Sequence, residues 1–287
     1  MNAAADDSNG TGHCAELVRA QDFTRYASTL FAPAPFRRSL LALYAFNVEI
    51  CRVHTQVSQP LPGEIRLQWW RDVLSGKGND GVEGNPVAAE LLLAIHGHRL
   101  PTDRLMRLVE EHEFDLYNDP MPTMAALEAY NNDTSSTIFS LAAAIMGSRS
   151  AEVEHLARHA GLAQGIVQAM TSLPFDASQR RLFLPQQVLA EHGCGPEEVF
   201  AGKQTPKLRE ALNDIFMEVR THLNAAYALL SSVAPDSRPA FLALAQVKRD
   251  LAVLSRADND PFVVQLPSRL RTLWTLWRAS RSRAFVF

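Results

Sequence analysis

The sequence is poor in cysteine and has no strong excess of charge of either sign. Its three cysteines, Cys14, Cys51 and Cys194, lie far apart. They predict neither a disulfide framework nor a C-x-x-C metal site, and they favour a reducing compartment. The 28 basic and 31 acidic residues give a formal net charge of −3. We therefore expect no nucleic acid among its partners, because such proteins usually carry a strongly basic surface.

Long apolar runs and targeting signals are also missing. No uninterrupted apolar stretch approaches the length of about 18 residues that a transmembrane helix needs. The first residues, MNAAADDSNGTGHCAE, lack the basic start and apolar run of a secretory signal. We interpret residues 1–15 as a flexible leader and expect a cytoplasmic location.

Strand-like alternation with a period of two is absent, whereas helical patterns recur along the chain. From Leu208 to Leu230, apolar residues follow one another at steps of three and four, after Thr205 as a plausible N-cap and Pro206 in the first turn. Further helices are expected over residues 38–57, 123–147 and 151–173. We therefore predict an all-α fold, with residues 16–287 forming a single helical domain.

Two of these helices have the composition of central elements. The helix at 38–57 is apolar nearly all round, as expected at the centre of a bundle. The helix at 151–173 carries small residues, including Gly161 and Gly165, that let neighbouring helices approach closely. Two such helices are expected to face a common cavity. The glycine-rich stretch 75–86 lacks the spacing of a phosphate-binding loop and is interpreted as a surface loop.

Four segments occur in the order and spacing seen in squalene and phytoene synthases: FRRSLLALYAFNVEI, GEIRLQWWRDVL, AGLAQGIVQAM and RRLFLP. The chain resembles that family over roughly residues 20–280. The resemblance implies an isoprenoid-synthase-type helical bundle with a central cavity. Active members carry two aspartate clusters on facing helices, whose carboxylates hold Mg²⁺ against a prenyl diphosphate.

Both aspartate clusters are degenerate in this sequence. The first pattern, D-D-x-x-D, falls on residues 51–55, where Cys51, Arg52 and Thr55 replace the three aspartates. The second, D-x-x-x-D, begins at Ser172 and keeps only its last aspartate, Asp176. Arg52 reverses the charge beside the implied metal site, and its repulsion of a divalent ion is costly in a partly dry cavity. We therefore expect no catalytic residue, no metal ligand and no cofactor; only an active prenyltransferase would need Mg²⁺.

The resemblance implies that the cavity which holds substrate in active members is lined here by the degenerate motif positions Tyr44, Asn47, Glu49, Cys51, Arg52, Thr55, Gln168, Ser172, Asp176 and Arg181. Two interpretations of Arg52 stay open. It forms an ion pair with Glu49, three residues earlier on the same helix, or it receives an anion such as a diphosphate or a partner's carboxylate. Asp176, shortly after Pro174, is interpreted as a loop or cap residue rather than a surviving metal ligand.

One branch of the family is especially similar. The segments AFNVE and VSQPLPGEIRLQWWR resemble those of the phytoene-synthase-like assembly factors of respiratory complex I and their alphaproteobacterial relatives. That resemblance implies a non-catalytic protein that binds a complex I subunit or an assembly intermediate. Two alternatives remain open: a squalene/phytoene synthase-type prenyltransferase that condenses prenyl diphosphates, and a prenyl-lipid-binding protein without turnover.

The C-terminal stretch, residues 261–287, contains five arginines and no acidic residue. An amphipathic helix that combines arginine with tryptophan suits an anionic membrane surface. The candidate contacts are Arg271, Trp274, Trp277, Arg278 and Arg281, on the inner face of the cytoplasmic membrane. A final bundle helix with its apolar side on the core and a solvated basic tail is a compatible alternative.

His155 and His159 have the i, i+4 spacing of a zinc pair. The H-E-x-x-H order is absent and the sequence shows no third ligand. We interpret the pair as part of a solvated or interfacial helix face.

Overall fold

A computed structural model describes residues 3–77, 82, 84–264 and 268–282. Its α-helices are α1 (Ala3–Gln21), α2 (Phe23–Thr29), α3 (Ala34–Cys51), α4 (Val53–Gln56), α5 (Pro60–Leu74), α6 (Pro86–His98), α7 (Thr102–Glu111), α8 (Met124–Asn131), α9 (Thr137–Ile145), α10 (Ala151–Thr171), α11 (Leu173–Ser178), α12 (Gln186–Glu191), α13 (Pro196–Phe200), α14 (Pro206–Leu229), α15 (Leu244–Leu254) and α16 (Arg269–Arg281). Short 3-10 turns span Phe114–Leu116, Leu230–Ser232 and Pro235–Phe241. The described residues contain no strand, which confirms the all-α prediction.

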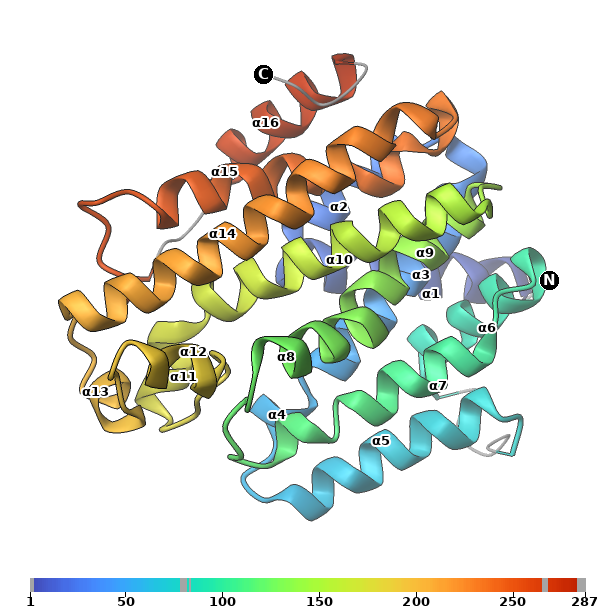
Figure 1. The fold of residues 1–287 in the computed structure, drawn as a ribbon. Coiled ribbons are helices and arrows are strands. Elements are labelled where there is room, and N and C mark those ends of the chain that lie inside the picture. The colour runs from blue at the N-terminus through green and yellow to red at the C-terminus, as the bar shows by residue number, and fades with distance from the viewer. Residues whose placement is uncertain (1–2, 78–81, 83, 265–267, 283–287) are drawn as a thin grey trace.

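The bundle is built around two long helices, α10 and α14, which lie side by side (Figure 1). On the other side of α10 lie α8 and α9, and α3 packs against α9 behind them. The pair α5 and α7 forms the far layer, opposite α16 (Figure 1). Both long helices begin at the expected caps: the Thr205 side chain accepts a hydrogen bond from the Leu208 backbone N, and Ser150 does the same for Val153.

Two expected helices are interrupted beside the cavity. The helix predicted over 38–57 ends as α3 at Cys51 and resumes as α4 at Val53, with Arg52 between them. The helix predicted over 123–147 contains a π-helical turn, Asn132–Ser136, between α8 and α9. Interruptions of this kind are frequent at functional sites, and amphipathic spacing does not reveal them because the residues on either side remain helical.

The interrupted segment packs directly against the glycines of α10. A Cβ atom added at Gly161 would overlap the Ser136 backbone, and one at Gly165 would overlap the Asn131 side chain. The Ser136 hydroxyl donates to the Arg158 carbonyl at 2.9 Å. These two glycines are therefore the small residues that bring α10 against the π-helical turn, as their composition predicted.

Most of the segment interpreted as a flexible leader is helical, and its residues 1 and 2 lie outside the described residues. Residues 3–15 belong to α1, and Cys14 is only 1% exposed within the core. Helix α1 packs on α2, α3 and α6. Small and acidic residues favour a flexible leader, but such composition carries no information about the tertiary contacts of Cys14 and Val18. The predicted surface loop 75–86 lies between α5 and α6, and residues 78–81 and 83 of it lie outside the described residues.

Candidate functional site

A cavity of about 200 Å³ lies where α3, α4, α8, α10 and α11 meet. Seven of the residues expected from the degenerate motifs line it: Asn47, Cys51, Thr55, Gln168, Ser172, Asp176 and Arg181. The two degenerate motifs therefore face each other across one cavity. A second hollow of about 370 Å³ shares Arg25, Asn47, Cys51 and Gln168 with it, so Cys51 borders both spaces.

The other three expected residues lie elsewhere. Tyr44 is buried in the core, with its ring 5.5 Å from the Arg25 guanidinium carbon, and is not among the lining residues. Glu49 faces a third hollow, together with His13, Arg66 and Asn85. Arg52 borders the second and third hollows but not the cavity itself. Helix geometry explains this for Glu49 and Arg52, which point around the helix axis away from Cys51. Tyr44 lies two turns before Cys51 on nearly the same face and is buried deeper in the core.

The described residues contain no ion pair between Arg52 and Glu49. The Arg52 guanidinium has no hydrogen bond or ion pair within the part of the chain that the structure describes. Glu49 is half-buried, and burial raises the pKa of its carboxyl group although a hydrogen bond from Asn85 opposes the shift. Of the two interpretations of Arg52, an unpaired cation able to receive an anion is the one that its surroundings favour.

At the second motif, the surviving aspartate is held by the residue that replaces its partner. Asp176 is 7% exposed and lies within α11, not in a loop. Its Oδ2 accepts a hydrogen bond from the Ser172 hydroxyl at 2.8 Å. Burial raises the pKa of Asp176, while the Ser172 hydrogen bond and the charge of Arg181 work in the opposite direction. This carboxylate is thus buried with one neutral donor rather than opposite a second aspartate.

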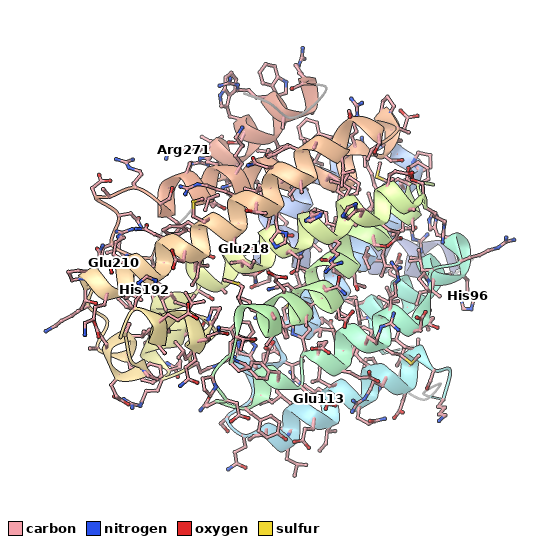
Figure 2. The ribbon with its side chains drawn as sticks, viewed as in Figure 1. His96, Glu113, His192, Glu210, Glu218 and Arg271 are labelled. Carbon is pink, nitrogen blue, oxygen red and sulfur yellow. The ribbon has the colours of Figure 1, made fainter. Side chains whose placement is uncertain are left out.

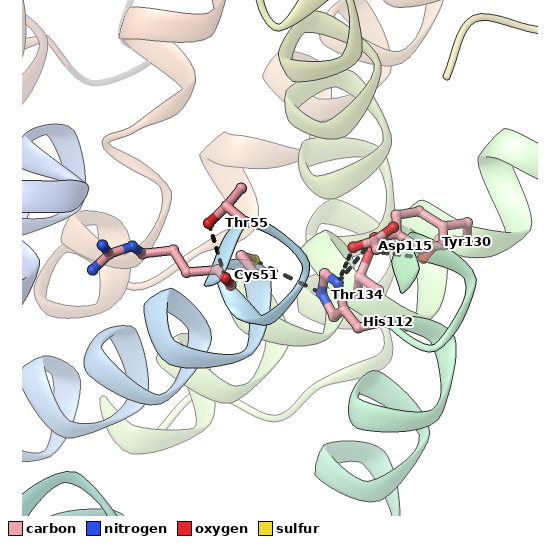
Figure 3. Close-up of polar contacts among 7 residues, drawn as sticks. Cys51, Thr55, His112, Asp115, Tyr130 and Thr134 are labelled. Carbon is pink, nitrogen blue, oxygen red and sulfur yellow. Dashed lines mark hydrogen bonds and ion pairs between the residues drawn. The ribbon is translucent and has the colours of Figure 1, made fainter. Parts of the chain in front are cut away.

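A polar cluster that the sequence did not reveal lies at the first motif (Figure 3). The Cys51 sulfur is 3.7 Å from His112 Nε2, and His112 Nδ1 is 2.7 Å from Asp115 Oδ2. The Tyr130 hydroxyl donates to the same carboxylate, at 3.0 Å from Oδ2. His112 and Asp115 lie in EEHEFD, a run that resembles a solvated acidic face, and only its fold toward Cys51 brings the three side chains together.

Because the cluster is buried, the protonation states of His112 and Asp115 depend on each other. Burial disfavours the charged form of His112, but the neighbouring charges of Cys51 and Asp115 outweigh it and raise the pKa of His112 to about 10. Burial likewise opposes ionisation of Asp115, yet the charge and hydrogen bond of His112 hold the Asp115 pKa below its ordinary value. Asp115 is therefore a carboxylate paired with an imidazolium ion.

These residues do not fit the magnesium site that the fold family implies. Asp176 is the one motif carboxylate present, Asp115 is committed to His112, and Arg25, His54 and Arg181 line the same cavity. Mg²⁺ requires several oxygen ligands in near-octahedral geometry, often with substrate phosphates and water. Among the described residues, the only group of three or more potential ligands is Glu128, Glu218 and His222, which does not line the cavity.

The histidine pair on α10 is extended by a third histidine from α14. His159 Nε2 lies 3.0 Å from His155 Nε2, and His159 Nδ1 lies 2.9 Å from His222 Nδ1. His222 Nε2 lies 3.3 Å from a carboxylate oxygen of Glu218, which is labelled in Figure 2. The interfacial interpretation of the pair therefore agrees with its place between α10 and α14, and the third histidine was invisible because it lies 63 residues further along the chain.

Helix α16 packs on α15 and α2 through Thr272, Leu276 and Ala279. Its outer side exposes Leu270 (80%), Trp274 (59%) and Trp277 (39%). The two indole rings stack at 5.0 Å, and the Arg281 guanidinium carbon lies 4.7 Å from the Trp277 ring centre. Arg271 is exposed on the same helix (Figure 2). Within the described residues, no helix is both long and apolar enough to cross a bilayer.

The class of protein follows from this fold and from its match to known sequences. Residues 18–278 match the squalene/phytoene synthase family model, and the chain belongs to that family. A dehydrosqualene synthase solved in complex with a ligand has the same fold, with a TM-score of 0.83 and 15% identity over 94% of this chain and 95% of that one. The squalene synthase HpnC from Alicyclobacillus acidocaldarius superposes with a TM-score of 0.72 and 19% identity, over 86% of this chain and 93% of that one. These structures confirm the expected isoprenoid-synthase-type fold.

A more similar relative belongs to the branch that the sequence motifs indicated. The protein named NADH dehydrogenase (ubiquinone) complex I, assembly factor 6, from Rattus norvegicus is 34% identical over 250 residues. The match covers 87% of this chain and 75% of the rat protein. The resemblance to the assembly-factor branch is therefore confirmed.

Proposed function

We propose that this protein is an assembly factor for respiratory complex I, and that it acts by binding a subunit or an assembly intermediate rather than by prenyl transfer. Its similarity to a protein of that name supports the first part. The arrangement of the cavity supports the second and is the observation that carries it: the single remaining motif carboxylate, Asp176, is bonded to Ser172.

The charges around the cavity oppose diphosphate ionisation assisted by metal ions. Prenyl transfer in this family depends on metal ions that neutralise the departing diphosphate. Here Arg25 and Arg181 line the cavity, His112 holds a positive charge, and Cys51 and Thr55 replace aspartates. Each cation repels a divalent ion, and this repulsion grows as water is excluded. The binding interpretation needs none of the missing ligands.

A gene deletion distinguishes a role in complex I assembly from a role in isoprenoid synthesis. We expect deletion of the encoding gene to lower the amount of assembled complex I on native gels and NADH–ubiquinone oxidoreductase activity, with squalene and carotenoid contents unchanged. An Asp176→Asn variant is expected to restore assembly fully, because Asn can still accept the Ser172 hydrogen bond. Normal complex I with depleted isoprenoids would reject the proposal.

Calorimetry on the purified protein tests the two alternatives directly. Farnesyl and geranylgeranyl diphosphate are titrated with and without Mg²⁺, and the products of the same samples are identified. We expect no Mg²⁺-dependent binding and no diphosphate release. Turnover would establish a prenyltransferase, and Mg²⁺-independent binding of the prenyl compounds would favour a lipid-binding protein.

We further propose that α16 makes a peripheral contact with an anionic membrane surface, on the cytoplasmic side of the membrane that holds complex I. The exposed side chains of Leu270, Trp274 and Trp277 and the arginines of α16 support this contact. Tryptophan places an apolar ring with one polar edge at the lipid interface, and arginine is attracted to anionic head groups.

Flotation with vesicles tests this contact. We expect the protein to float with vesicles that contain phosphatidylglycerol, and less so with pure phosphatidylcholine or in high salt. Replacing both tryptophans, Trp274→Ala with Trp277→Ala, is expected to weaken binding at least about tenfold, because burial of each ring contributes about 1.5–3 kcal/mol. The control Leu93→Ala removes an apolar side chain on α6 whose exposure, 55%, lies between those of the two tryptophans. Equal loss in the control and the double variant would exclude α16 as the contact.

A further inference from the structure

Cys51 differs from the other two cysteines in both exposure and surroundings. Cys14 and Cys194 are 1% and 2% exposed, and burial raises the pKa of each thiol, for Cys14 to about 12. Cys51 is half-buried at the end of α3 and borders both the cavity and the second hollow. It is therefore the cysteine that a small molecule in either space can reach.

The groups behind Cys51 are ordered as in an activated thiol. His112 Nδ1 donates to Asp115 at 2.7 Å, so the carboxylate fixes the ring with Nε2 toward the Cys51 sulfur at 3.7 Å (Figure 3). The Tyr130 hydroxyl bonds to the same carboxylate and holds it in place. A thiol, a base within reach and a third group that orients the base are the elements of nucleophilic catalysis.

Several basic side chains surround Cys51. His112 is buried and its pKa is raised to about 10, so it stays protonated at neutral pH beside the sulfur. The other charged or titratable groups that line the two spaces are Asp22, Arg25, Arg52, His54, Tyr130, Asp176, Arg181 and Asp250. Asp22 is paired with Arg25, and Asp176 is bonded to Ser172, whereas Arg52 lies unpaired beside the second hollow within the described residues. Cysteines in such electropositive, partly accessible places are the reactive ones.

We propose that Cys51, with His112 and Asp115, forms a reactive thiolate site that exchanges with small disulfides. The step balances within these groups. His112 already holds the proton on Nε2, and the Cys51 thiolate attacks one sulfur of R–S–S–R, which breaks that S–S bond and forms Cys51–S–S–R. The Cys51 sulfur is oxidised and the displaced sulfur is reduced. The released thiolate takes the proton from His112 and leaves as R–SH, because loss of the Cys51 charge removes one cause of the high His112 pKa.

This proposal does not depend on the proposed role in complex I assembly. It assigns a reaction to one position of the degenerate motif. Cys51 stands at the position of the first aspartate of the family's D-D-x-x-D pattern. A small group attached there through a disulfide occupies space between α3 and α10 and removes the negative charge of the thiolate. The cavity then takes two states that depend on the redox state of the low-molecular-weight thiols around it.

The experiment follows the reaction of the full chain with dithiodipyridine, a small uncharged disulfide, at pH 5 and pH 7. Free cysteine, with a pKa of about 8.5, is almost entirely protonated at pH 5, whereas an ion-paired thiolate persists. After allowance for the lower nucleophilicity of a more acidic thiol, we expect the folded protein to react at pH 5 at least about tenfold faster than free cysteine. Peptide mass spectrometry should place the modification on Cys51, and Cys51→Ser should abolish the fast phase.

Variants then assign the roles of the neighbours. His112→Gln is expected to lower the pH 5 rate at least about tenfold, and Asp115→Asn is expected to shift the pH profile toward that of free cysteine. Oxidised glutathione, incubated with the wild-type protein, should leave a mixed disulfide on Cys51 and not on Cys14 or Cys194. The comparison of wild type with free cysteine stands even if a variant fails to fold. A wild-type rate at pH 5 no faster than free cysteine, or an unchanged rate in folded His112→Gln, would overturn the proposal.

Discussion

Asp115 and Asp176 line one cavity and are buried to nearly the same extent, 8% and 7% exposed, yet their pKa values move in opposite directions. The pKa of Asp115 is held down by the charge and hydrogen bond of His112, which outweigh its burial. Asp176 has a neutral donor, the Ser172 hydroxyl, and burial raises its pKa. The comparison teaches that the partner, and not the depth of burial, decides whether a carboxylate in this cavity stays charged.

The same difference separates the two degenerate motifs. At the first motif, where the aspartates are missing, an ion pair is made from residues outside the motif, His112 and Asp115. At the second, a hydroxyl at position 172 replaces an aspartate and removes the repulsion that a second carboxylate would exert on Asp176. Neither arrangement needs a divalent ion to balance its charge, but only the first places a thiol beside a histidine.

The largest expected effect comes from neutralising each carboxylate in turn. Asp115→Asn removes the counter-ion of a buried imidazolium, so we expect the free energy of unfolding to fall by about 3–5 kcal/mol. Asp176→Asn keeps an acceptor for Ser172 and is expected to change it by less than about 1 kcal/mol. Urea denaturation at pH 7 measures both. Equal losses in the two variants would show that the two carboxylates do not differ as described.

A smaller expected effect is the pH dependence of the stability that Asp115 and Asp176 contribute. The lowered pKa of Asp115 contributes stability that is present above about pH 3.8 and is lost as the pH falls through its folded pKa. The raised pKa of Asp176 acts with the opposite sign: the folded state binds more protons just above pH 3.8, so its contribution falls as the pH rises through that window. The stability that wild type has over Asp115→Asn should therefore grow with pH in the acid range, whereas Asp176→Asn should become more stable relative to wild type as the pH rises.

On the alkaline side, His112 dominates the expected profile. Its pKa of about 10 is above the unfolded value of 6.5, so its contribution is complete below pH 6.5 and is lost as the pH rises toward 10. One proton gives a slope of at most about 1.4 kcal/mol per pH unit. Denaturation of wild type and His112→Gln between pH 6 and pH 10 measures it, and parallel profiles would contradict an ion-paired His112.

Much of this protein was predictable from local pattern. The apolar spacing and the caps at Ser150 and Thr205 specify α10 and α14, because capping and amphipathicity depend on residues only a few positions apart. The motif order indicated the family and its assembly-factor branch, and seven of the ten expected positions do line one cavity. The degenerate positions Cys51 and Ser172 were visible as substitutions in the sequence alone.

Only the tertiary structure decided what those substitutions do. His112, Asp115 and Tyr130 lie 61 to 79 residues beyond Cys51, so no spacing rule joins them. Only the folded chain brings their side chains together at the end of α3. The same holds for residues 3–15, whose composition indicated a flexible leader and whose segment is the helix that buries Cys14. Sequence patterns report the chemistry of a residue and its near neighbours, whereas charge state, access and reactivity depend on groups that meet only when the chain is folded.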